Sequence, residues 1–76
     1  ISLTYLEFGN ESFNNGNYEK AKDYYTQAIE LEKNHVYYSN RSAAFFELED
    51  YEASLADAEE AIKLNPTYWK VHLLLT

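Results

Sequence analysis

The segment NYEKA at residues 17–21 returns as DYEAS at residues 50–54, and AIEL at residues 28–31 returns as AIKL at residues 61–64. Both segments recur at the same distance along the chain, from residue 17 to residue 50 and from residue 28 to residue 61. This distance is the repeat period. A self-match at a period in the thirties is typical of repeat proteins, in which each unit buries its apolar face against its neighbours. The chain is therefore expected to present a grooved surface to a partner rather than to perform chemistry itself.

The length and composition indicate one small folded domain. Of the 76 residues, 46% are hydrophobic and 17% are aromatic, and eight of the aromatic residues are tyrosines, so the chain is not a disordered tail. The sequence holds only two Gly and one Pro, which favours an all-helical fold.

The charge and residue usage argue against several classes of function. The net charge of −7, from 13 acids against six bases, would repel the phosphates of nucleic acid. The absence of cysteine removes disulfides, thiol nucleophiles and thiolate metal sites. No apolar run approaches the roughly 20 residues of a membrane span and no signal peptide is visible, so no membrane segment is expected. We expect a cytoplasmic protein. Because the chain starts at Ile1 without an initiator Met, we interpret it as a piece of a longer protein.

Apolar periodicity and helix-breaking residues predict five helices. Asn17 and Asp50 are expected to cap the second and fourth helices, and Gly16 and Pro66 are expected to interrupt the chain. The predicted helices cover residues 3–14, 18–32, 36–48 and 51–64, and a fifth runs from residue 67 to the end.

Two ion pairs are expected on the helix surfaces. Glu59 and Lys63 have the i,i+4 spacing that stabilises a helix by a few tenths of a kcal/mol. Arg41 is expected to pair with a nearby acid such as Glu7 or Glu11.

No catalytic or metal site is predicted. His35 and His72 lie far apart in the sequence and have neither Cys nor a paired acid at ligand spacing, so a zinc site is not expected. The serines lack a nearby histidine base, which leaves nucleophilic catalysis without support. We therefore expect no cofactor and no enzymatic activity.

The residues that recur resemble the tetratricopeptide repeat (TPR) family over the whole chain. The family signature is visible in the first repeat as Tyr5, Phe8, Gly9, Ala21, Tyr25 and Ala28, and in the second as Tyr38, Phe45, Ala58, Ala61 and Pro66. Ser42 stands where the signature has Gly, and Ser54 stands where it has Ala. The resemblance implies a single all-α domain over residues 1–76, with antiparallel helix pairs at residues 2–34 and 35–68 stacked into a right-handed superhelix. Residues 69–76 would begin a third repeat or form a capping helix.

The resemblance also implies a peptide-binding groove lined by the first helix of each pair. By position, the lining residues are Leu6, Asn10, Phe13, Ser39, Asn40, Ala43, Phe46, Lys70 and Leu74. Co-chaperone TPR domains hold the C-terminal Glu-Glu-Val-Asp carboxylates of heat-shock chaperones with a clamp of two Asn, two Lys and one Arg. Asn10, Asn40 and Lys70 match three of these positions, whereas Leu6 replaces a Lys and Leu74 replaces the Arg.

Three hypotheses for function follow. The first is a co-chaperone-type module of a larger protein, which binds an extended peptide, with the C-terminal tail of a heat-shock chaperone as the candidate partner. The second is a structural scaffold that docks a helix or another copy through residues 69–76, where apolar side chains lack a covering helix. The third is a targeting domain attached to an enzyme. A titration with an acidic C-terminal peptide separates the first from the second, and flanking sequence would reveal the third.

Overall fold

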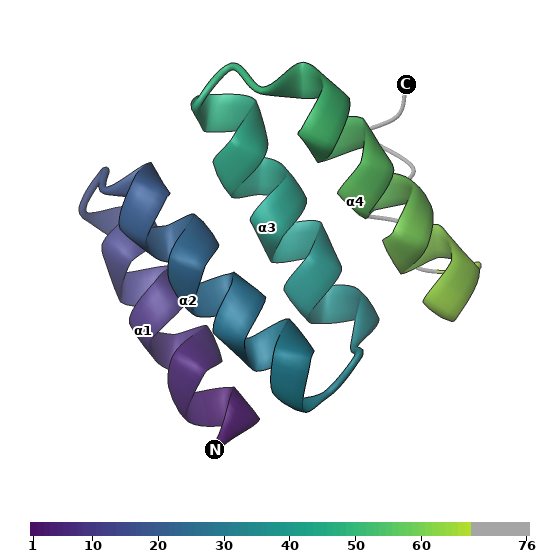
Figure 1. The fold of residues 1–76 in the computed structure, drawn as a ribbon, viewed down its shortest axis with the longest axis horizontal. Coiled ribbons are helices and arrows are strands. Elements are labelled where there is room, and N and C mark those ends of the chain that lie inside the picture. Colours follow the sequence, from purple (N-terminus) through teal and green to yellow (C-terminus); the bar gives the residue numbers. More distant parts are fainter. Residues whose placement is uncertain (68–76) are drawn as a thin grey trace.

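Four consecutive α-helices make up the part of the protein that the computed structural model describes, residues 1–67 (Figure 1). Helix α1 covers Ser2–Asn14, α2 covers Tyr18–Leu31, α3 covers His35–Glu47 and α4 covers Tyr51–Leu64. The predicted all-helical class is confirmed, and no strand occurs in the described residues. Each predicted boundary of these helices lies within one residue of the observed one. The predicted fifth helix lies almost entirely outside the described residues.

Short polar side chains fix where three of the helices begin. The side chains of Asn17 and Asp50 accept hydrogen bonds from the backbone N–H three residues on, at 3.2 and 3.3 Å, which confirms both as N-caps. Asn34 caps α3 in a similar way, accepting from the N–H two residues on at 2.8 Å. This cap was not predicted, since Asn34 was expected only to connect two helices.

The two intra-repeat turns share one backbone conformation. Gly16 has φ of +80°, and Glu49, which occupies the equivalent position of the second repeat, has φ of +63°. Both residues occupy the left-handed region, which costs a side-chain-bearing residue roughly 1–2 kcal/mol. The second repeat therefore keeps the turn of the first without its glycine.

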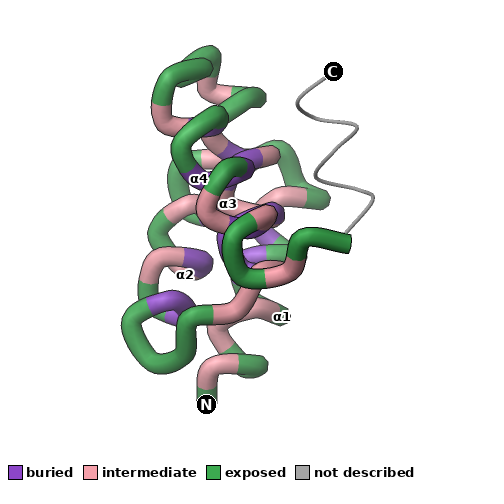
Figure 2. Tube along the Cα trace, turned by 90° about the vertical axis from the view of Figure 1, so that its right-hand side faces the viewer, coloured by how far each residue is buried: buried purple, intermediate pink, exposed green. Residues whose placement is uncertain are grey.

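The helices run antiparallel, and each packs against the next one in the chain (Figure 1). Each of the four helices carries buried residues among exposed ones (Figure 2). One core cluster joins α2, α3 and α4 and contains Ala28, Ile29, Tyr37, Tyr38, Ala58 and Ala61. A second cluster joins α2 and α3 and contains Ala21, Tyr25 and Ala44. Small residues predominate at the helix crossings, which allows close approach.

Compensating changes explain why the second repeat departs from the family signature. In the first repeat, a Cβ added to Gly9 would lie 2.5 Å from the Tyr25 ring, so this position must be glycine. The second repeat has Ala58 at the position equivalent to Tyr25, which leaves room for Ser42. Ser42 Oγ donates to the carbonyl of Ser54 at 2.7 Å, and Ser54 Oγ donates to the carbonyl of Ser42 at 2.8 Å. Two buried hydroxyls thus join α3 to α4 where the first repeat uses Gly and Ala.

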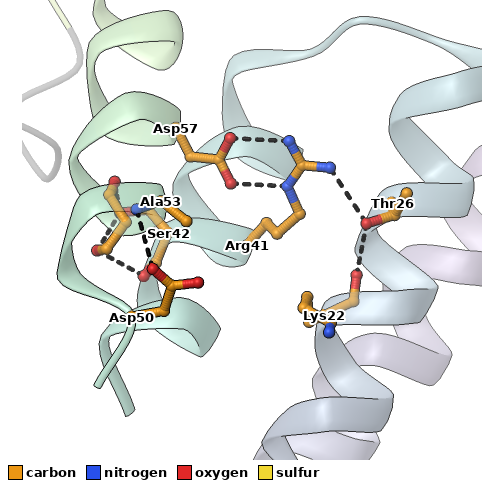
Figure 3. Close-up of polar contacts among 8 residues, drawn as sticks. Lys22, Thr26, Arg41, Ser42, Asp50, Ala53 and Asp57 are labelled. Atoms are coloured by element: carbon orange, nitrogen blue, oxygen red, sulfur yellow. Dashed lines mark hydrogen bonds and ion pairs between the residues drawn. The ribbon is translucent and has the colours of Figure 1, made fainter. Parts of the chain in front are cut away.

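A buried ion pair in the second repeat corrects the prediction for Arg41. Arg41 does not pair with Glu7 or Glu11; its Nε and Nη2 donate to the two carboxylate oxygens of Asp57 at 2.6 and 2.8 Å (Figure 3). Its Nη1 donates to Thr26 Oγ1 at 3.1 Å, which ties the pair to α2 of the first repeat. The expected acidic partner is confirmed, but the two acids named for it were wrong, because α3 lies between α2 and α4 and the side chain reaches those helices rather than α1.

The equivalent positions of the first repeat carry aromatic rings. Phe8 and Tyr24 lie one repeat period before Arg41 and Asp57, and their ring centroids are 5.4 Å apart. The same contact between paired helices is therefore apolar in one repeat and ionic in the other. The expected Glu59–Lys63 pair is also corrected, since Lys63 Nζ lies 3.9 Å from Glu60 instead.

Candidate functional site

A cavity of about 360 Å³ opens between α1 and α3. It is lined by Asn10, Phe13, Asn14, Tyr25, Asn40 and Ala43. Asn10 and Phe13 come from α1, Asn40 and Ala43 from α3, and Tyr25 rises from α2 beneath them. The structure thus brings four of the sequence-predicted groove residues to one cavity.

Three side chains in this cavity form a connected hydrogen-bond network. Tyr25 Oη donates to Asn10 Oδ1 at 2.6 Å, and Asn40 Nδ2 donates to the same oxygen at 3.3 Å. Tyr25 is only 2% exposed, and its burial raises the pKa of the phenol from 10.0 to about 12. A phenol is neutral at physiological pH even at its ordinary pKa, and the upward shift keeps its proton available to donate.

Burial of Tyr25 also fixes the orientation of the Asn10 amide. A buried hydroxyl hydrogen without an acceptor costs about 1–3 kcal/mol. Within the described residues, Asn10 Oδ1 is the acceptor that the phenol has. If the amide turned over, its NH₂ group would face the phenol and the hydroxyl hydrogen would lose this acceptor.

At Asn10 the network leaves hydrogen-bond donors for a ligand. Asn10 Oδ1 already accepts two hydrogen bonds, so its Nδ2 with two N–H groups is what remains. Asn40 Nδ2 uses one N–H on Asn10 and retains the other. A ligand rich in acceptors, such as a carboxylate or a backbone carbonyl, fits these groups.

Three other predicted groove residues, Leu6, Ser39 and Phe46, do not line the cavity. Leu6 packs against both core clusters and is only partly exposed. Ser39 is 2% exposed, and its hydroxyl has no hydrogen-bond partner in the described part of the chain. Phe46 is 52% exposed and lies edge-on against Tyr51, with ring centroids 5.3 Å apart. Lys70 and Leu74, which complete the predicted set, lie outside the described residues.

Sequence reasoning missed the polar role of Tyr25. The family resemblance marked this residue only as a packing position. The sequence did contain a sign of this role: Tyr25 carries a hydroxyl at a position where the second repeat has the apolar Ala58.

Positive charge is absent from the cavity lining described here. Arg41 is held by Asp57, Lys22 lies 2.7 Å from Glu19, and Lys20 lies 5.9 Å from the centre of the Tyr24 ring. Residues 1–67 contain no group of three side chains suited to hold a metal ion. In that same part of the chain, no helix combines the length and apolarity needed to cross a membrane.

Comparison with known proteins identifies relatives of this chain. A tetratricopeptide repeat family model matches residues 2–35 and 36–68. The chain is 43% identical over 75 residues to "Heat shock protein STI1" of Saccharomyces cerevisiae, covering 92% of this chain and 13% of that protein. It is 44% identical over 63 residues to the "Hsp70-Hsp90 organizing protein" of Triticum aestivum, covering 82% and 11%. The chain thus spans only a small part of the length of these relatives.

Solved structures with the same arrangement of helices include one with a bound peptide. The first TPR of Spaghetti (RPAP3), bound to HSP90 peptide SRMEEVD, superposes with a TM-score of 0.90 at 34% identity. That alignment covers 92% of this chain and 56% of the other. The Sgt2 TPR domain from Aspergillus fumigatus superposes with a TM-score of 0.90 at 37% identity, covering 92% and 47%.

Proposed function

Because this chain belongs to the tetratricopeptide repeat family, we propose that it is a binding module that receives an acidic C-terminal peptide in the cavity between α1 and α3. The observation that carries the proposal is the pair of asparagine amides whose free N–H groups suit a carboxylate. The relatives support the class of partner. One is a heat shock protein, and a structural neighbour was solved with an HSP90 peptide that ends in a carboxylate-rich sequence. A chaperone tail is therefore the partner we propose.

The proposed mechanism is hydrogen bonding of a carboxylate by neutral amides. Asn10 and Asn40 donate to the ligand, and Lys70 would add one cation from outside the described residues. The two leucines, Leu6 and Leu74, remove two cations of the five-residue clamp that the family resemblance implies. Each charge-assisted hydrogen bond is worth about 1.5–3 kcal/mol, so we propose weaker binding than a complete clamp would give.

Isothermal titration calorimetry with the peptide SRMEEVD tests this proposal. The free-acid peptide is expected to bind more tightly than the same peptide with an amidated C-terminus. Asn10→Ala and Asn40→Ala are each expected to weaken binding by about tenfold, the equivalent of roughly one hydrogen bond. Gln27→Ala is the control, since it removes an amide that lines a separate cavity.

Two results would contradict the proposal. One is equal affinity for the free-acid and amidated peptides. The other is a loss with Gln27→Ala as large as the loss with Asn10→Ala.

Restoring the missing cations provides a second test. The double variant Leu6→Lys with Leu74→Arg is expected to strengthen binding of the acidic peptide. Leu6 packs against both core clusters, so replacing it costs about 1–3 kcal/mol of stability, and the titration should be run well below the unfolding temperature. An unchanged affinity in the folded double variant would show that the alignment of these positions with the clamp is wrong.

The wider context of the module is part of the same proposal. We place it as a single domain of a larger cytoplasmic protein, since the relatives are many times longer than this chain. It has no catalysis of its own in this account, and any enzymatic activity would come from another domain. Self-association through residues 69–76 stays a prediction, because those residues lie outside the described part.

A further inference from the structure

We propose that Tyr25 is a positioning residue that sets the ligand preference of the groove by holding the Asn10 amide with its N–H groups toward the ligand. This inference rests on the proposed function and deepens it, since it explains how the Asn10 amide comes to offer N–H groups to a carboxylate. In this account Tyr25 acts on the ligand only through Asn10.

Two hydrogen bonds, one from α2 and one from α3, converge on a single atom of α1. Asn10 Oδ1 on α1 accepts from Tyr25 Oη on α2 at 2.6 Å and from Asn40 Nδ2 on α3 at 3.3 Å. The phenol thus orients the first amide directly, and the first amide then orients the second. Both asparagines line the same cavity, and each keeps at least one N–H group outside this network.

The ring that carries the phenol is held firmly in place. Tyr25 is 2% exposed, and it fills the space that the missing side chain of Gly9 leaves beside it. A Cβ at Gly9 would lie 2.5 Å from Tyr25 Cε1, so the ring and the glycine fit each other closely. A fixed ring gives the hydroxyl a fixed position, which is what an orienting group needs.

The second repeat provides an internal comparison. The position equivalent to Tyr25 is Ala58, and the position equivalent to Asn10 is Ala43, each one repeat period later. The phenol and the amide therefore occur together in the first repeat and are absent together from the second. The second repeat, which lacks the amide, also lacks the tyrosine.

Loss of the hydroxyl should release the amide. Without the phenol, Asn10 can turn over and present Oδ1 to the cavity, where it would repel a carboxylate oxygen. The preference for a free C-terminal carboxylate over a carboxamide should then diminish, even though Asn10 and Asn40 are both still present.

Tyr25→Phe and Tyr37→Phe form a matched pair for the test. Tyr37 is also 2% exposed, and its hydroxyl lies 3.0 Å from Ser2 Oγ, away from the cavity. Free-acid and amidated SRMEEVD are titrated into the wild type and both variants. We expect Tyr25→Phe to weaken binding of the free acid by about threefold to tenfold, corresponding to one hydrogen bond, and to bring the two peptides closer in affinity. Tyr37→Phe should leave both affinities unchanged. Equal losses in both variants, or none in Tyr25→Phe, would overturn the inference.

A measurement without peptide separates this inference from the proposed function. In ¹H–¹⁵N spectra of the free protein, the side-chain NH₂ signals of Asn10 and Asn40 should shift in Tyr25→Phe and stay in place in Tyr37→Phe. Unchanged Asn10 signals in Tyr25→Phe would refute the positioning role even if the peptide binds. If the wild type binds no acidic peptide while the Asn10 signals shift, the positioning geometry stands and the proposed function fails.

Discussion

Removing the Arg41 side chain should be the most damaging single change to the charged groups of the described residues. The side chain of Asp57 is only 8% exposed, and both of its carboxylate oxygens are bonded to Arg41. Arg41→Ala would leave that carboxylate buried without a partner and would also break the link to Thr26. Removing one partner of a buried ion pair costs about 3–5 kcal/mol. Small domains have a total stability of the order of 5–15 kcal/mol, so the variant should lie close to unfolding.

The first repeat suggests how that loss can be repaired. Phe8 and Tyr24 occupy the positions equivalent to Arg41 and Asp57, and there they pack as rings. The double variant Arg41→Phe with Asp57→Tyr removes the buried charge as well as its partner. Apolar replacement of a buried ion pair is often neutral, so the double variant should recover to within about 1–2 kcal/mol of the wild type.

Urea unfolding followed by circular dichroism measures these differences. Lys63→Ala is the control, since Lys63 is 75% exposed and lies 3.9 Å from Glu60, and its loss should cost less than about 0.5 kcal/mol. A cost below about 1 kcal/mol for Arg41→Ala would show that the pair behaves as a solvated surface pair. A double variant no more stable than Arg41→Ala would show that the unpaired charge is not the origin of the loss.

Three further changes test local features of the fold. Ser39→Ala should stabilise the protein by about 1 kcal/mol because it removes a buried hydroxyl without a hydrogen-bond partner in the described residues. Ser42→Ala should destabilise it by about 1–2 kcal/mol because that hydroxyl is hydrogen-bonded. Thermal unfolding that shows stability changes of the same sign in both variants would refute this contrast. Glu49→Gly should stabilise by about 0.5–1 kcal/mol by relieving a positive φ, whereas Gly16→Ala, whose Cβ would meet nothing within 4 Å, should destabilise by about 1 kcal/mol, as urea titrations can check. Burial raises the pKa of Tyr25 to about 12, so the neutral phenol contributes stability that is complete below pH 10. As the pH rises toward 12 this contribution declines by about 2–3 kcal/mol. Alkaline denaturation of Tyr25→Phe should lack this decline, and identical curves for the variant and the wild type would contradict the prediction.

The fold was predictable because local signals and the repeat agree. Asn17 and Asp50 cap their helices as expected, and Gly16 adopts the positive φ that its turn needs. The repeat period then placed similar helices at similar positions in both repeats. These features depend on residues close in sequence, which explains why helix boundaries were predicted within one residue.

Contacts between helices were harder to predict because they depend on the packing around each helix. α3 is packed between α2 and α4, so Ser39 is buried, although Leu6 at the equivalent position of α1 stays partly exposed. The same packing directs Arg41 to Asp57. The aromatic residues Phe8 and Tyr24 were a usable signal for that pair, since they have the same separation in the first repeat as Arg41 and Asp57 have in the second.

Two amides of the cavity lining were predictable from the sequence, but the hydroxyl that bonds one of them was not. The family resemblance placed Asn10 and Asn40 on the first helix of each pair, and both line the cavity. It gave no indication that the Tyr25 hydroxyl turns Asn10 so that donors remain for a ligand. Such a contact depends on the depth at which a side chain from the second helix enters the groove.

The most direct test of the proposed function is a ¹H–¹⁵N titration of the protein with free-acid SRMEEVD. We expect the largest shifts at the side-chain amides of Asn10 and Asn40 and at backbone signals of Phe13 and Ala43, which line the cavity. Signals around Gln27, in the separate cavity, should stay in place. Shifts centred on Gln27, or no shifts at millimolar peptide, would contradict the account.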